Sequence, residues 1–154
     1  MLKNSELFQP SLEEGWNETK TYDINRLFYV AFFGGTIPTI ILGTRNAKWL
    51  NIPKNHINLL IFIGVLLTIV DFILIYLYAS GFIPQDSKQF IKLGIQFLAI
   101  ILFFLYRFAL IKPFQQHMVT NGEVIPILKP AILWVLFGAI CKSIVIIMIA
   151  YEVY

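Results

Sequence analysis

Charged residues are scarce in this chain. Asp, Glu, Lys and Arg make up 14% of its 154 residues, whereas a soluble domain has about 25%. Hydrophobic residues make up 58%, and the mean hydropathy is +0.73. This balance is typical of a protein whose solvent is lipid. The sequence therefore predicts an integral membrane protein with the lipid bilayer as its first partner.

Several kinds of functional sequence are also missing. The one cysteine, Cys141, excludes an internal disulfide. There is no run of Lys or Arg and the net charge is only +3, so nucleic acid is not an expected partner. Paired aspartates, a serine elbow and a glycine-rich phosphate loop are absent, which argues against an enzyme. His56 and His117 lack the spacing of metal ligands, so no metal or other cofactor is expected.

Four long hydrophobic runs are present instead. The second, from Ile57 to Ala79, has Asp71 as its only charge. As a helix it would be roughly 34 Å long, enough to cross a bilayer core of about 30 Å. The fold class predicted is all-α, a four-helix membrane bundle over residues 26–154 with spans at about 27–43, 57–79, 90–111 and 131–151. Pro113 is expected to end the third span.

The first 25 residues form a polar, acidic tail without the apolar segment of a signal peptide. A capping-box pattern after Pro10 indicates that a short interfacial helix could begin there. The first span follows and contains Gly34, Gly35 and Pro38. Pro38 removes a backbone donor and crowds the carbonyl of Gly34, so a kink is expected near Gly34. Two interpretations are open: a notch for close helix packing, or a discontinuous helix that binds something.

Four spans would place both termini and the second loop on one side of the membrane. The first and third loops would lie on the other side, which carries slightly more basic residues. The two sets compared are Lys20, Arg26, Lys88 and Lys92 against Arg45, Lys48, Lys54, Lys112 and Lys129. The positive-inside rule then favours cytoplasmic first and third loops, with both termini outside.

Charges inside the spans are costly, so they are expected to face the bundle and find partners. Counted along the helices from the first-and-third-loop side, Asp71 lies roughly 21 Å deep, Lys142 roughly 18 Å and Gln96 roughly 24 Å. We therefore predict an intramembrane polar cluster in which Asp71 and Lys142 form an ion pair. Gln96 is its expected neighbour, with Thr68 or Ser143 as further candidates. The pair could fix helix register or serve a proton- or ion-linked site.

Residues at the predicted membrane interface complete the candidates. Arg45 and Asn46 follow the first span, Arg107 lies about 7 Å below the surface and should extend to the headgroups, and His117 follows the third span.

Two short patterns resemble a family of small uncharacterised bacterial proteins with four transmembrane helices. They are Gly34-Gly35-x-x-Pro38 followed by Gly43 and Arg45-Asn46, and Gln115-x-His117 followed by Gly122. The resemblance implies an architecture of four transmembrane helices, and it implies no catalysed reaction.

The sequence thus favours a non-catalytic, multi-pass membrane protein, and the resemblance implies that its location is the bacterial cytoplasmic membrane. It would act through contacts with other membrane components, as an accessory subunit, a sensor or an immunity-type protector. The alternative is a minimal transporter or channel that uses Asp71, Lys142 and Gln96. Four helices rarely enclose a wet pore alone, so the alternative requires self-association.

Overall fold

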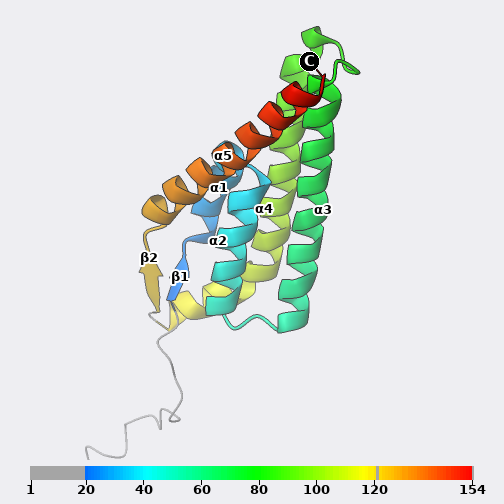
Figure 1. Cartoon of the computed structure of the whole chain (residues 1–154). Coiled ribbons are helices and arrows are strands. Elements are labelled where there is room, and N and C mark those ends of the chain that lie inside the picture. Colours follow the sequence, from blue (N-terminus) through cyan, green and yellow to red (C-terminus); the bar gives the residue numbers. More distant parts are fainter. Residues whose placement is uncertain (1–19, 121, 154) are drawn as a thin grey trace, which may run out of the picture.

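The chain is mostly helical in the computed structural model, which describes residues 20–120 and 122–153 (Figure 1). From the amino end, the elements are β1 (Lys20–Tyr22), η1 (Ile24–Arg26), α1 (Leu27–Gly34), α2 (Thr36–Trp49), α3 (Lys54–Ala79), η2 (Gln85–Ser87), α4 (Lys88–Val119), β2 (Glu123–Ile125) and α5 (Leu128–Val153). The predicted short helix after Pro10 lies outside the described residues.

Three of the described helices, α3, α4 and α5, are long and apolar enough to cross a membrane. They contain the predicted spans at 57–79, 90–111 and 131–151; each helix begins two or three residues earlier, and α4 and α5 also end later. The expectation of a membrane protein built from helices is confirmed at this level. The count of four spanning helices is not, because the predicted first span has a different structure.

Residues 27–43 do not form one helix. The chain breaks at Gly35, between α1 and α2, and reverses direction there (Figure 1). Residues near the start of α1 and the end of α2 pack against the same part of α4. The Phe28 ring contacts the Phe103 ring, and the Thr44 hydroxyl is hydrogen-bonded to the Tyr106 hydroxyl. The two helices therefore form a hairpin rather than the predicted kinked span.

The two strands show on which side this hairpin begins. β1, before α1, pairs in parallel with β2, in the connection between α4 and α5, with Lys20 opposite Glu123 and Tyr22 opposite Ile125. The amino end of the described chain thus lies on the side of the α2–α3 and α4–α5 connections, called the strand side here (Figure 1). The prediction that it lies on the other side, together with the α3–α4 connection, is wrong.

Helix α4 also differs from the prediction, because it continues through Pro113 to Val119. A proline inside a helix removes one hydrogen bond and bends the axis. The last turns of α4 lie across the strand side of the molecule (Figure 1). Pro113 therefore redirects the helix instead of ending it.

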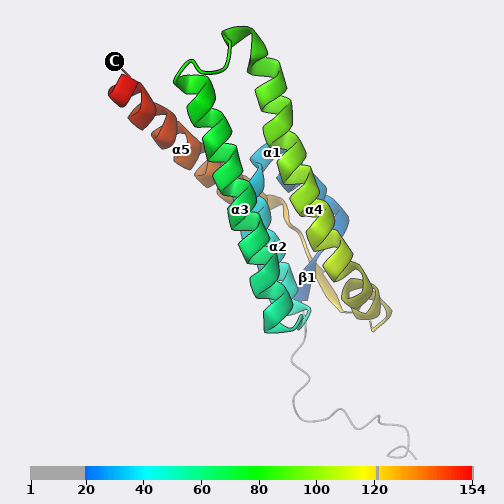
Figure 2. The same ribbon diagram turned by 90° about the vertical axis from the view of Figure 1, so that its right-hand side faces the viewer.

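The buried core lies between the hairpin and helices α3 and α4. Among its residues are Leu27, Val30, Leu42, Leu60, Leu102, Tyr106 and Leu110. Helix α5 is inclined to α3 and α4 (Figure 2). Only 11% of its most apolar stretch is buried in the protein, against 28% for α4. Most of the surface of α5 is therefore left for lipid.

Candidate functional site

The candidate site surrounds the hairpin tip, which consists of Gly34, Gly35 and Thr36. Gly35 has φ +83° and ψ −158°, a conformation essentially restricted to glycine. Its N–H donates to the carbonyl of Ala31, and its carbonyl accepts from the hydroxyl of Thr39 at 2.7 Å. Irregular backbone at membrane depth is tolerated only where protein or a water-filled cavity surrounds it. The tip meets this condition, since Gly34, Gly35 and Thr36 are all buried.

Asp71 of α3 lies against the tip and is fully buried. Its Oδ2 accepts a hydrogen bond of 2.8 Å from the hydroxyl of Thr36, the first residue of α2. The amino end of a helix carries a partial positive charge, so it favours a carboxylate placed there. The other carboxylate oxygen, Oδ1, has no hydrogen-bond partner in the described part of the chain. Asp71 is therefore held by the hairpin tip through one of its two oxygens.

Lys142 of α5 lies on another side of the tip. A Cβ atom on Gly35 would lie only 2.8 Å from the Lys142 ammonium nitrogen. Lys142 interacts electrostatically with Asp71. Among the described residues, however, ion pairs within 4.0 Å join only Lys20 to Glu123 and Arg26 to Asp23. The predicted direct ion pair is not formed, because the hairpin tip provides the contact that Lys142 was expected to make.

The other predicted members of the polar cluster are Gln96, Thr68 and Ser143, and the structure places them in two settings. Gln96 of α4 lines the cavity described below, as Lys142 does. Thr68 and Ser143 donate to carbonyls four residues earlier in their own helices, those of Gly64 and Ala139. Neither of these two hydroxyls bonds Asp71. Depth counted along the helices therefore did not predict the hydrogen-bond partners of these side chains.

A cavity of about 670 Å³ adjoins the hairpin tip. The tip and α1 contribute Gly34, Gly35 and Phe32, while α3, α4 and α5 provide the remaining walls, which are mostly apolar. Lys88, Lys92 and Gln96 of α4 and Lys142 of α5 add polar groups. This volume lies within the range of about 300–1,000 Å³ that is usual for small-molecule sites. We call it the tip cavity.

On the strand side of the tip, the hairpin packs tightly against α3 and α4. A Cβ atom on Gly43 would lie 2.7 Å from the Tyr106 ring, and one on Gly64 would lie 2.6 Å from the Ile40 side chain. Thr39 and Leu42 are fully buried in the same region. The tip cavity is therefore closed below by packed side chains.

Helix α5 approaches the tip through small residues. A Cβ atom on Gly138 would lie 3.3 Å from the Pro38 ring, and one on Gly34 would lie 2.7 Å from the Val135 side chain. Pro38 is the third residue of α2, where a missing N–H removes no helical hydrogen bond. Glycine and proline here begin a second helix and let α5 pack closely against it.

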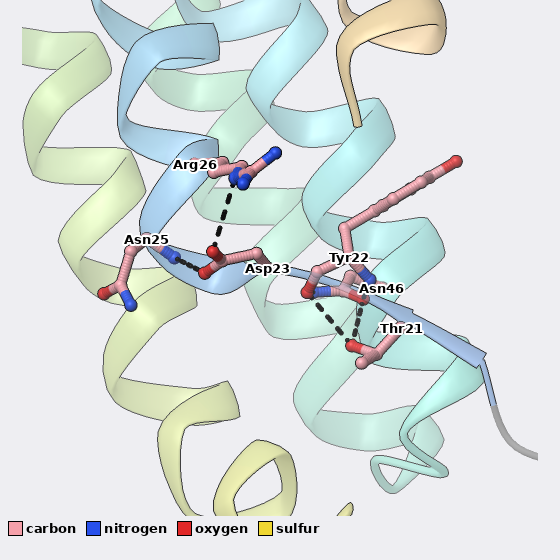
Figure 3. Close-up of polar contacts among 6 residues, drawn as sticks. All are labelled: Thr21, Tyr22, Asp23, Asn25, Arg26 and Asn46. Atoms are coloured by element: carbon pink, nitrogen blue, oxygen red, sulfur yellow. Dashed lines mark hydrogen bonds and ion pairs between the residues drawn. The ribbon is translucent and has the colours of Figure 1, made fainter. Parts of the chain in front are cut away.

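Asn46 closes the base of the hairpin (Figure 3). It is buried, and its side-chain oxygen accepts from the Thr21 hydroxyl at 2.7 Å and from the Tyr22 N–H at 2.8 Å. Its side-chain nitrogen donates to the Tyr22 carbonyl at 3.2 Å. Beside it, the Arg45 guanidinium lies 4.6 Å from the centre of the Trp49 ring. Asn46 was predicted to lie at the membrane interface. In the structure it is a buried residue that joins α2 to β1.

The remaining candidates lie near the strand side and away from the tip cavity. Arg107 is exposed. His117 is buried, with Nε2 lying 3.2 Å from the Glu123 carbonyl oxygen. A Cβ atom on Gly122 would overlap the His117 ring, so this spacing requires glycine. No group of three or more metal-ligating side chains occurs in residues 20–120 and 122–153.

Sequence reasoning missed Thr36, Lys88 and Lys92 as members of the site. A signal for Thr36 was available, because a glycine pair followed by threonine and an early proline is typical of a helix start. The sequence places Lys88 and Lys92 only near the membrane boundary. No protein family matches the chain, and no curated protein or solved structure is significantly similar to it.

Proposed function

We propose that this is a non-catalytic integral membrane protein that acts by binding another membrane component in the tip cavity. The observation that carries the proposal is the shape of that cavity. It is lined by residues of α1, α3, α4 and α5 and by Gly35, has mostly apolar walls, and ends on packed side chains at the hairpin tip. A mostly apolar cavity that ends on packed side chains favours binding over conduction.

The membrane topology that we propose has three crossings, α3, α4 and α5, in place of four. The α1–α2 hairpin enters from the strand side and returns to it. Basic residues on the strand side are Lys20, Arg26, Arg45, Lys48, Lys54, Arg107, Lys112 and Lys129, whereas Lys88 and Lys92 lie towards the opposite side. This asymmetry is much larger than four spans would give, and it favours a cytoplasmic strand side. The bacterial cytoplasmic membrane remains our proposed location, on the resemblance described above.

Binding in the cavity can be tested by filling it. Ala139 and its neighbour Ile140 are both exposed, but only Ala139 lines the tip cavity. We expect a total lipid extract of the native membrane to raise the melting temperature of the purified wild type and of Ile140→Trp, because a ligand that binds only the folded state stabilises it. Ala139→Trp should lose this gain. Equal stabilisation of all three proteins would contradict the proposal.

One observation favours the alternative function, a minimal oligomeric transporter. Asp71 and Lys142 flank an irregular hairpin tip, and broken helices beside charges form substrate sites in transporters. Proton or solute flux into vesicles that contain the wild type, lost in Asp71→Asn, would support this alternative. Absence of flux in both would favour the binding function.

A further inference from the structure

Helix α4 presents a polar stripe to the tip cavity. Lys88, Lys92 and Gln96 all line it, and they are spaced by four residues along the helix. Residues four apart share one face of a helix, and each step advances about 6 Å along the axis. The stripe therefore leads from the beginning of α4 into the cavity, while Ile91 and Ile95 add apolar surface beside it.

The depth of the two lysines can be judged from the length of α4. Lys92 and Lys112 are separated by twenty residues, which corresponds to about 30 Å of helix and matches the hydrocarbon core. With Lys112 at one boundary of the core, Lys92 lies at the other and Lys88 just outside it. Phosphate groups of lipids occupy this level. The cavity thus begins at the headgroups and continues into the acyl region.

The charges of Lys88 and Lys92 are not balanced by the cavity. Its lining contains three lysines and no carboxylate. Lys142, the deepest of them, interacts with Asp71. Neither of the two ion pairs within 4.0 Å in the described residues includes Lys88 or Lys92. Asp86, two residues before Lys88, is exposed in the turn η2 and does not line the cavity.

We infer that the tip cavity binds an anionic phospholipid, with its phosphate at Lys88 and Lys92 and an acyl chain along the apolar walls of α3, α4 and α5 towards the hairpin tip. Two cations at headgroup level above a mostly apolar cavity match the charge and the polarity of such a molecule. This inference rests on the proposed function and specifies its ligand.

The test compares lipids and paired lysine variants in the purified full chain. Phosphatidylglycerol, phosphatidylcholine or inorganic phosphate is added in an uncharged detergent, and the apparent affinity is obtained from the rise in melting temperature. We expect phosphatidylglycerol to bind more tightly than phosphatidylcholine, and inorganic phosphate to have no effect. Loss of two lysines in Lys88→Gln/Lys92→Gln should weaken binding of phosphatidylglycerol roughly 30-fold.

The matched control is Lys48→Gln/Lys112→Gln, which removes the same charge from exposed positions on the strand side. It should bind phosphatidylglycerol like the wild type. Equal losses in the two double variants would overturn the inference, as would an equal effect of inorganic phosphate. If phosphatidylcholine binds as well as phosphatidylglycerol and Ala139→Trp blocks both, the anion preference is wrong but the proposed function stands. If Ala139→Trp blocks neither, both are wrong.

Discussion

The hydroxyl of Thr36 donates a 2.8 Å hydrogen bond to Oδ2 of Asp71 and so connects the hairpin tip to α3. Both residues are fully buried. The bond joins the first residue of α2 to the only acidic residue within the predicted spans. A buried carboxylate has few ways to replace a lost donor in lipid, so the position of the tip depends on this contact.

Replacing Thr36 by Val should therefore destabilise the protein. Removing the donor leaves a buried acceptor unsatisfied, which costs about 1–3 kcal/mol. The quantity to measure is the free energy of unfolding in mixed micelles. Thr68→Val is the control, because the Thr68 hydroxyl bonds only the Gly64 carbonyl of its own helix, a contact that adds little to helix stability. Equal losses of unfolding free energy in the two variants would show that the Thr36–Asp71 bond adds no more stability than a hydrogen bond within one helix.

Gly35→Ala should destabilise the folded state by more than its size suggests. A backbone conformation of this kind costs about 1–3 kcal/mol in other residues, and the new methyl group would also displace the Lys142 ammonium. Gly94→Ala is the matched control, since nothing lies within 4 Å of a Cβ there and the backbone is helical. In unfolding titrations, the changes in the free energy of unfolding caused by the two substitutions should differ in sign or by several-fold. A neutral Gly35→Ala would rule out the hairpin turn.

Asp71 and Lys142 should be energetically coupled even though they form no direct ion pair. In a double-mutant cycle with Asp71→Asn and Lys142→Gln, we expect the double variant to lose less stability than the sum of the single losses, by about 0.5 kcal/mol or more. The same cycle with Lys112→Gln should be additive, because Lys112 lies near the far end of α4. Additivity in both cycles would mean that Lys142 does not compensate Asp71.

Asn46→Ala should release β1 from α2. The Tyr22 N–H would lose its partner in a buried place, at a cost of about 1–3 kcal/mol. Fluorescence of Trp49, whose ring lies 4.9 Å from that of Tyr22, would report the change alongside the unfolding free energy. Asn58→Ala, at an exposed position on α3, should leave both measurements unaltered. Similar behaviour of the two alanine variants would argue against the network in Figure 3.

Membrane topology can be determined with single cysteines in a Cys141→Ser background. Asn25, Asn51 and Asp86 are exposed and lie before α1, after α2 and after α3. A hairpin with three crossings predicts that an impermeant thiol reagent labels positions 25 and 51 from one side of the membrane and position 86 from the other. Four crossings would instead group position 25 with position 86. The labelling pattern in sealed, oriented vesicles decides between them.

Hydrophobic run length was enough to predict α3, α4 and α5, because a helix that crosses lipid must satisfy its backbone internally and cover a fixed thickness. For residues 27–43, the same reasoning predicted one crossing helix, whereas the structure has a hairpin. Their composition suits a crossing helix, but Gly35 allows the chain to reverse, and the pairing of β1 with β2 holds the start of the hairpin on the side where the hairpin also ends. A run of apolar residues indicates burial in lipid or protein, and it carries no information on direction.

The sequence alone therefore determined the membrane class of this protein and the approximate extents of α3, α4 and α5, since both follow from composition and from the length of apolar runs. Only the tertiary structure decided the partners. Asp71 meets Thr36, and Lys88 and Lys92 share a cavity with Lys142, because the α1–α2 hairpin packs against the longer helices. Contacts of this kind depend on rotation about each helix axis and on distant strand pairing, which no local pattern of residues encodes.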